Sequence, residues 1–250
     1  MRLLADLHTH TVASGHAFST VGEIARAAAA RGLELVAITD HGPAVPGGAH
    51  LWHFWNSRTI PSELEGVRVL KGCEANPVPD TDNGLDIPDE VLQALEFVAV
   101  GLHPGCGYDA RDRVRNTEAL VRAIENPFVD MVTHPGNEED FPVDLDRVVS
   151  AAVEHGVILE LNNFSFDARS GRHATRGRER EFAEAARDAG AFIAVDSDAH
   201  IHTLVGEVSG ALAVVEEIGF PLERIVNRDA AAVLGFLSAR RKRALSQKAG

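Results

Sequence analysis

The sequence contains little cysteine and no long apolar run. Its two cysteines, Cys73 and Cys106, lie far apart and form no CxxC pair, which argues against a disulfide framework and against a cysteine-based zinc finger. No stretch approaches the roughly 18 apolar residues that a membrane helix needs, and the N-terminal segment already reaches a charged residue at Asp6. We therefore expect a cytoplasmic protein with no membrane partner.

Basic charge is also in short supply. The 24 Lys and Arg residues face 37 Asp and Glu residues, so the formal net charge is -13. A chain this acidic is not expected to bind long nucleic acid, which normally requires a basic face. Hydrophobic residues at 45% and charged residues at 24% are typical of a globular domain, which excludes disordered and low-complexity classes. Histidine, in contrast, is abundant, with 12 residues.

Short apolar runs alternate with alanine-rich amphipathic segments along the chain. Seven runs predict strands: RLLADLH, ELVAITDH, VRVLKGCEAN, EFVAVGLH, FVDMVTHP, VILELNN and FIAVDSDAH. The intervening segments predict helices over residues 21–31, 116–124, 145–155, 179–189 and 206–218. Thr20 and Glu23 form a capping-box pattern before the first of these helices, and Gly32 suits its end. The alternation predicts an α/β fold with a mainly parallel sheet.

We read residues 1–250 as a single domain, because no Ser/Pro/Gly-rich linker divides the chain. Residues 229–237 are expected to form a closing helix. The basic run at 240–243 and the rest of 238–250 are predicted to be a solvated C-terminal tail.

Metal-ligating residue types follow the predicted strands in order. The strand ends carry His8 and His10, then Asp40 and His41, Glu74, His103, His134, Asn162 and Asn163, and finally Asp198 and His200. Because the C-terminal ends of parallel strands emerge at one face, these side chains are expected to converge in one pocket. Imidazole and carboxylate ligands without thiolate favour catalytic zinc, with manganese or iron as alternatives.

Each of these residues also has an ordinary structural explanation when taken alone. His41 could cap a helix and Glu74 could be a salt-bridge partner. Taken together, chance would have to place histidines and acids at successive strand ends, where buried unpaired charges cost several kcal/mol each. His155 fits a helix C-terminus and Cys73 a buried inert thiol, whereas His50, His53, His173 and His202 stay unassigned.

The blocks DLHTHTVAS, AITDHGP, GCEAN, GLH, THPGN, ELNNFSF and DSDAH, in this order, resemble the PHP (polymerase and histidinol phosphatase) family, and especially its stand-alone bacterial phosphatases. The resemblance implies a distorted seven-stranded TIM-like (β/α) barrel with three divalent metal ions, and in related phosphatases a trimer. By the same resemblance, His8, His10, Glu74 and Asp198 would hold the first ion. Glu74, His103 and His134 would hold the second, and His16, His41 and His200 the third.

The expected activity is hydrolysis of small phosphate monoesters by a metal-bound hydroxide, because coordination lowers the pKa of water toward about 7. Asp40 is predicted to accept a hydrogen bond from a ligating imidazole, and Arg58 and Arg169 are candidate phosphate clamps. Alternatives are an exonuclease or nucleotide phosphatase acting on short oligonucleotide ends, a histidinol-phosphate phosphatase, and a noncatalytic metal-binding module. For the oligonucleotide alternative, Trp52, Phe54 and Trp55 could stack one base.

Overall fold

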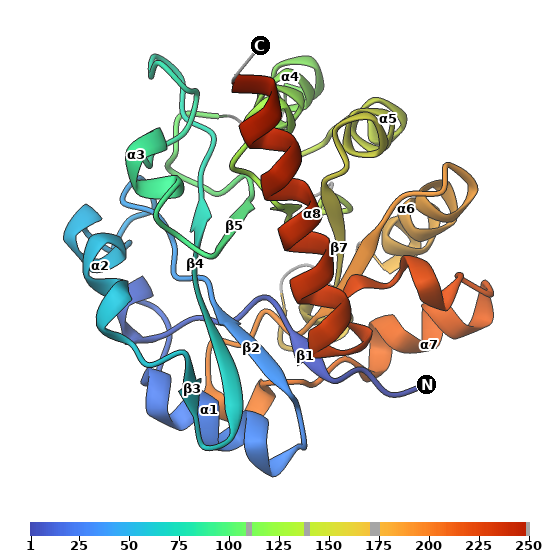
Figure 1. Cartoon of the computed structure of the whole chain (residues 1–250). Helices are drawn as coiled ribbons and strands as arrows, with labels where there is room; N and C mark the ends of the chain where they lie inside the picture. Colours follow the sequence, from blue (N-terminus) through green and yellow to red (C-terminus); the bar gives the residue numbers. More distant parts are fainter. Residues whose placement is uncertain (109–111, 138–140, 171–175, 249–250) are drawn as a thin grey trace.

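The computed structural model describes residues 1–108, 112–137, 141–170 and 176–248. Seven parallel strands in the order β1-β2-β4-β5-β6-β7-β8 curve into a nearly closed barrel, with helices on its outside (Figure 1). The strands are β1 (Ala5–Asp6), β2 (Leu35–Ile38), β4 (Val67–Ala75), β5 (Phe97–Val100), β6 (Met131–Val132), β7 (Ile158–Asn162) and β8 (Ile193–Asp196). Each predicted apolar run contributes one of these strands, which confirms the predicted α/β barrel. A short strand, β3 (Glu63–Leu64), pairs antiparallel with β4 and was not expected.

The helices that cover the sheet lie where amphipathic segments predicted them, with two short additions. They are α1 (Val21–Ala30), α2 (Leu51–Asn56), α3 (Asp89–Leu92), α4 (Arg113–Glu125), α5 (Leu145–His155), α6 (Arg176–Asp188), α7 (Ser209–Glu217) and α8 (Ala230–Lys248). The capping box of α1 is confirmed by hydrogen bonds in both directions between Thr20 and Glu23, and Gly32 follows with a left-handed φ of 67°. In the described part of the chain, no helix combines the length and the apolar character needed to cross a membrane.

Side chains help to close the barrel where β1 and β8 meet. The Leu7 amide donates to Asp196 Oδ1 at 2.7 Å, and the Ser197 amide donates to Asp6 Oδ1 at 3.2 Å. Further along, the His10 amide donates to the Ala199 carbonyl at 2.9 Å. These bonds replace part of a regular backbone ladder and satisfy amides that would otherwise be buried without a partner.

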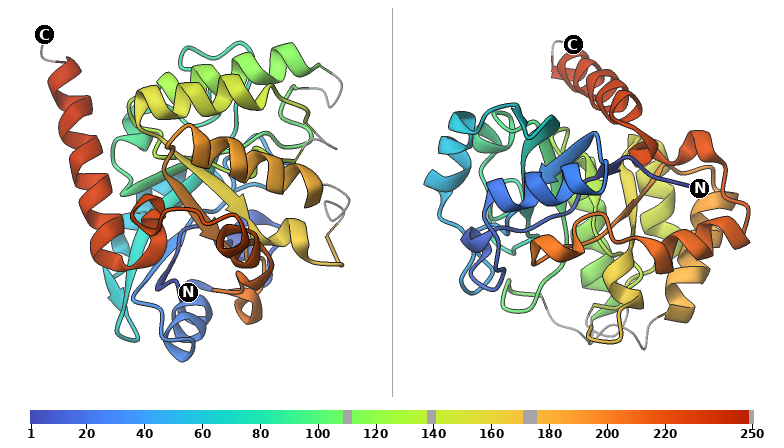
Figure 2. Two further views of the ribbon diagram at one scale, coloured as in Figure 1. Left: turned by 90° about the vertical axis from the view of Figure 1, so that its right-hand side faces the viewer. Right: turned by 90° about the horizontal axis from the view of Figure 1, so that it is seen from below.

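Helix α8 lies across the end of the barrel at which the strands begin (Figures 1 and 2). Its Val233 and Leu237 pack into the apolar cluster that fills this end of the barrel. Arg240 is buried and donates to the carbonyl oxygens of His155 and Gly156 at 2.7 and 3.1 Å. The expectation that a solvated tail begins at 238 is therefore wrong for Arg240, because unpaired carbonyls ahead of the strands bind its guanidinium.

Asp130, which precedes β6, faces Arg240 with 3.3 Å between Oδ1 and Nε. Burial raises the pKa of Asp130 from 3.8 to about 6, although Arg240 and Arg241 lower it. An acid whose pKa is higher in the folded than in the unfolded state destabilises the fold increasingly as the pH rises from about 4 through 6.

Substitution of Asp130 by Asn removes this titration. We expect the stability of D130N relative to the wild type to improve by about 2 kcal/mol between about pH 4.5 and pH 7.5. Urea unfolding of both proteins across this range measures the difference. A difference that does not change with pH would contradict the raised pKa.

Candidate metal centre

The nine ligands implied by the family resemblance come together at the C-terminal ends of the strands. Seven of these side chains are buried: His8, His10, His41, Glu74, His103, His134 and Asp198. His200 is half-buried and His16 is exposed. Residues from His8 to His200 in the sequence thus form one cluster, which is most exposed at His16 and His200.

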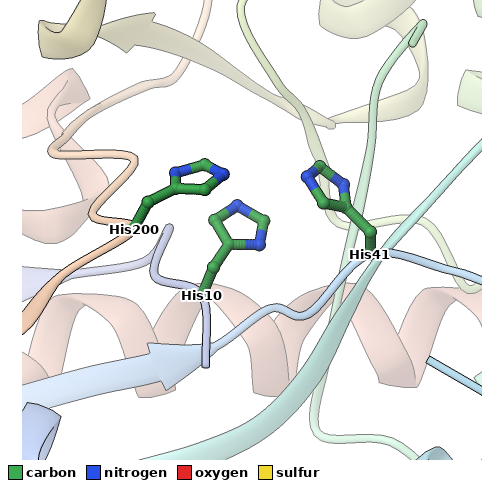
Figure 3. A group of neighbouring side chains, drawn as sticks. All are labelled: His10, His41 and His200. Atoms are coloured by element: carbon green, nitrogen blue, oxygen red, sulfur yellow. The ribbon is translucent and has the colours of Figure 1, made fainter. Parts of the chain in front are cut away.

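In the part of the chain that the structure describes, three groups of side chains have ligand atoms that all lie within 4.8 Å of one another. They are His8, His10 and Asp198; His41, Glu74 and His103; and His10, His41 and His200. Figure 3 shows the last group, with the three rings turned toward a common space. The Nε2 atoms of His8 and His10 are 3.0 Å apart, so the two histidines of the HTH motif point to the same side as expected.

Glu74 lies at the centre of the cluster, and its two carboxylate oxygens face different imidazoles. Oε1 lies 3.1 Å from His134 Nε2 and 3.4 Å from His103 Nε2. Oε2 lies 3.3 Å from His8 Nε2 and 2.9 Å from His41 Nδ1. This is the arrangement expected of a carboxylate shared between two ions.

Asp198 and His134 occupy unusual backbone conformations. Their φ angles are 52° and 35°, in the left-handed region that residues other than glycine rarely adopt. Asp198 Oδ1 consequently lies 3.3 Å from His10 Nε2 and 3.5 Å from His8 Nε2. Backbone strain of this kind is concentrated at functional sites, where the surrounding structure maintains it.

His16 reaches the cluster from a loop that is held against the segment after β8. The Phe18 amide donates to the His200 carbonyl at 2.8 Å, and Ser19 Oγ lies 3.1 Å from His202 Nδ1. The ring of His16 stacks at 5.0 Å on His41 and at 4.8 Å on His200, measured between centroids. Gly15 permits this path, because its φ is 77° and an added Cβ would lie 2.5 Å from a neighbouring carbonyl oxygen.

The donor atoms fit divalent metal ions. His41 Nδ1, Glu74 Oε2 and His103 Nε2 are buried and have no hydrogen-bond partner, although they belong to one ligand group. Buried polar atoms without hydrogen-bond partners are rare in folded proteins, and cations bound in the cluster would satisfy these three. Imidazole and carboxylate together are the ligands of catalytic zinc.

The charges in the cluster shift several pKa values. Burial lowers the pKa of His8, but the charges of Glu160, Glu74 and Asp198 outweigh it and raise this pKa well above 6.5. The pKa of His10 is lowered well below 6.5, first by burial and then by the positive charges of His41 and His200. The pKa of each histidine is thus set by the charges of the neighbouring ligands. Strong shifts of this kind are expected in a site whose charges bound cations would balance.

Asp40 does not contact a ligating imidazole directly, so the predicted contact is wrong. It accepts hydrogen bonds from the amide and hydroxyl of Thr11 and from Ser14 Oγ, all at 2.7 Å, and lies 3.1 Å from His53 Nε2. Ser14 Oγ is 3.2 Å from His10 Nδ1 and provides an indirect link. The reason is the alternation of side chains after β2, which turns Asp40 away from the face of His41. Burial raises the pKa of Asp40, but these hydrogen bonds prevail and lower it to about 2.

The two candidate phosphate clamps lie on the surface. Arg58 is exposed on a 3₁₀ turn, and Arg169 is exposed and binds Asp167 through Nε at 2.9 Å. Among the described residues, neither arginine contacts the cluster of candidate ligands. Their role as clamps stays a prediction.

Two of the unassigned histidines remain, His50 and His173. His50 accepts a hydrogen bond from the Trp52 amide at the start of α2, whereas His173 lies outside the described residues. Trp52 and Trp55 are exposed on α2, but Phe54 is buried in the core and is not available to stack a base.

Several residues that contact the ligands were not predicted, among them Ser14 and Asn76, whose Oγ and Oδ1 lie 3.2 Å from His10 Nδ1 and 2.7 Å from His103 Nδ1. Thr133 Oγ1 donates to Glu74 Oε1 at 2.6 Å, and the buried Glu160 lies 2.7 Å from His8 Nδ1. The signal for Glu160 was its position as a charged residue inside an apolar strand, two residues before Asn162 and therefore on the same face.

The cluster of imidazoles and carboxylates lies at the C-terminal end of a parallel (β/α) barrel, the face at which such barrels carry their active sites, and has the composition of a metal site. The sequence profile of the PHP domain matches residues 6–168, and the chain belongs to this family. The chain is 44% identical to a probable phosphatase of Caldanaerobacter subterraneus subsp. tengcongensis, over 97% of this chain and 94% of that protein. It is 45% identical to a probable phosphatase of Acetivibrio thermocellus, over 91% and 92%.

Solved structures share the fold at low sequence identity. Histidinol phosphate phosphatase from Lactococcus lactis, in complex with zinc, L-histidinol and phosphate, has a TM-score of 0.65 at 16% identity and covers 88% of this chain and 95% of its own. A chain of archaeal ribonuclease P with mature tRNA has a TM-score of 0.62 at 13% identity, covering 94% and 91%. At these identities the likeness concerns the fold alone.

Proposed function

We propose that this protein is a metal-dependent phosphatase that hydrolyses small phosphate monoesters at a centre of three divalent ions, most readily zinc. The observation that carries the proposal is the position of Glu74 between two sets of imidazoles, with buried donor atoms that have no other partner. The names of the relatives and the zinc and phosphate in the histidinol phosphate phosphatase structure support it.

Most residues of the site would hold ions, and two of them also mark the side from which substrate enters. His8, His10, Asp198 and Glu74 would hold one ion, Glu74 with His103 and His134 a second, and His16, His41 and His200 a third. Ions held there would lower the pKa of coordinated water and offset the charge of a phosphoryl group. Thr133 orients Glu74 through its hydrogen bond. The exposed His16 and half-buried His200 mark the side from which a phosphate reaches the site.

Hydrolysis of para-nitrophenyl phosphate in the presence of zinc or manganese tests the proposal. We expect the H41Q variant to lose at least about 100-fold in kcat/KM, because one ion loses an imidazole ligand. H155Q is the matched control, since His155 is exposed at the end of α5, just before the N-terminal end of β7, whereas the ligands follow the C-terminal ends of the strands. Equal activity of H41Q and the wild type would overturn the proposal, and so would faster cleavage of bis(para-nitrophenyl) phosphate, a diester.

No specific contact favours the other functions considered. Action on oligonucleotide ends, hydrolysis of histidinol phosphate, a cytoplasmic location and a trimeric or other homo-oligomeric state stay predictions.

A further inference from the structure

Glu160 lies inside the barrel, one level below the metal ligands. Alternate residues of β7 share a face, so Ile158, Glu160 and Asn162 follow one another along the barrel interior. Ile158 belongs to the apolar cluster that α8 closes, and Asn162 Nδ2 donates to Asp198 Oδ2 at 3.1 Å. The carboxylate of Glu160 therefore separates the apolar floor from the cluster of ligands, and it is fully buried.

Its two oxygens contact different ligand residues. Oε1 lies 2.7 Å from His8 Nδ1, and Oε2 accepts a hydrogen bond of 2.7 Å from the backbone amide of His134. Oε2 also accepts from Asn162 Nδ2 at 3.1 Å, and the same amide group binds Asp198. One carboxylate thus connects three ligand residues, among them the two whose φ angles are left-handed.

The contact with His8 decides which nitrogen of that ring is free. An ionised carboxylate only accepts hydrogen bonds, so the ring must donate from Nδ1, and a neutral imidazole then leaves Nε2 without a proton. His8 Nε2 is the atom that faces Glu74 and Asp198, at 3.3 and 3.5 Å. The nitrogen that points into the cluster is therefore the one able to ligate.

We propose, on the basis of the proposed function, that Glu160 is a positioning residue of the metal centre: it fixes the Nδ1–H tautomer of His8 and, directly and through Asn162, the backbone at His134 and the carboxylate of Asp198. A partner of this kind maintains ring orientation and raises the basicity of the ligand. Glu160 does not contact the substrate.

A glutamine at this position cannot reproduce both contacts. Its amide has one accepting oxygen and one donating NH2 group, whereas Glu160 accepts on both sides. If the oxygen stays on the His134 amide and Asn162, the NH2 group faces His8 Nδ1 and requires the proton to move to Nε2. E160Q is nearly the same size as the wild type, so it changes the hydrogen bonding without opening a cavity.

The test compares wild type, E160Q and D130N. D130N is the matched control, because it is also a carboxylate-to-amide exchange at a buried position and Asp130 contacts Arg240 and the Val98 amide instead of a ligand. Zinc affinity is measured by competition with a chromophoric chelator, and the protonated nitrogen of His8 by long-range ¹H–¹⁵N NMR of the wild type and of E160Q. The melting temperature of each metal-free protein is the third measurement.

We expect E160Q to bind its most affected zinc ion roughly 10- to 100-fold more weakly than the wild type, while D130N binds as the wild type does. At a pH at which the His8 ring is neutral, we also expect its proton to lie on Nδ1 in the wild type and on Nε2 in metal-free E160Q. Unchanged zinc affinity in E160Q overturns the proposal. A metal-free melting temperature that falls in E160Q without a loss of affinity would assign Glu160 a purely structural role.

If E160Q fails to fold, the wild-type spectrum still decides, because a neutral His8 ring that carries its proton on Nε2 contradicts the proposal. These measurements do not depend on turnover. A wild type that binds zinc but does not hydrolyse para-nitrophenyl phosphate would remove the proposed function and leave the role of Glu160 standing.

Discussion

Substitution of Glu74 by Gln is expected to reduce kcat for para-nitrophenyl phosphate by roughly 1,000-fold. Both oxygens of Glu74 face imidazole nitrogens, at distances of 2.9 to 3.4 Å. An amide offers one oxygen, so whichever way it is turned, one set of imidazoles loses its shared ligand. Lewis-acid stabilisation of a transition state amounts to several kcal/mol, and about 1.4 kcal/mol corresponds to a tenfold change in rate.

The matched control for E74Q is E96Q. Glu96 precedes β5 and is half-buried in ion pairs with Arg68 and Lys71 at 2.6 and 2.7 Å, so it is a paired glutamate outside the cluster. E96Q should keep the metal content and turnover of the wild type. Metal analysis of purified E74Q should show fewer equivalents per chain than wild type. A fully active E74Q that retains its metal would show that Glu74 is not a shared ligand.

The fold could be predicted from sequence where local and global signals agree. The Thr20–Glu23 capping box and Gly32 mark both ends of α1, because they satisfy or terminate backbone hydrogen bonding locally. The seven apolar runs became strands because a parallel sheet is covered on both faces. The hairpin of β3 was missed, since it consists of two residues and its turn at Glu65 and Gly66 lacks a strong sequence pattern.

The positions of the ligands could be predicted because parallel strands all end at one face. Residues that follow successive strands in the sequence therefore lie close together in the fold. The partners of those ligands could not, because they depend on which way a side chain turns below or beside the cluster. Asp40 turned to Thr11 and Ser14, and Glu160 reached His8 across 152 positions of sequence. Arg240 was likewise assigned to a tail, since the carbonyl groups that it binds belong to distant segments.

Removal of the metal ions is expected to lower the melting temperature by at least about 8 °C. A single site at a free metal concentration of 1,000 times its Kd stabilises the folded state by about 4.1 kcal/mol, and each kcal/mol corresponds to about 2–4 °C for a chain of roughly 150–250 residues. Without ions, the buried carboxylates of Glu74 and Asp198 would also lack the positive charge that ligated cations supply. Differential scanning calorimetry before and after EDTA treatment measures the effect.

The same experiment separates metal binding from other effects of the chelator. EDTA saturated with zinc should leave the melting temperature unchanged, and adding zinc to the stripped protein should restore it. D198N should show a smaller loss than the wild type, because Asp198 Oδ1 faces three imidazoles, those of His8, His10 and His200. The loss should also shrink as the pH falls, since an imidazole ligates only when neutral and His8, whose pKa is raised well above 6.5 in the metal-free protein, then holds a proton that competes with the metal. An EDTA effect that is equal in D198N and wild type would place the stabilising ions elsewhere in the molecule.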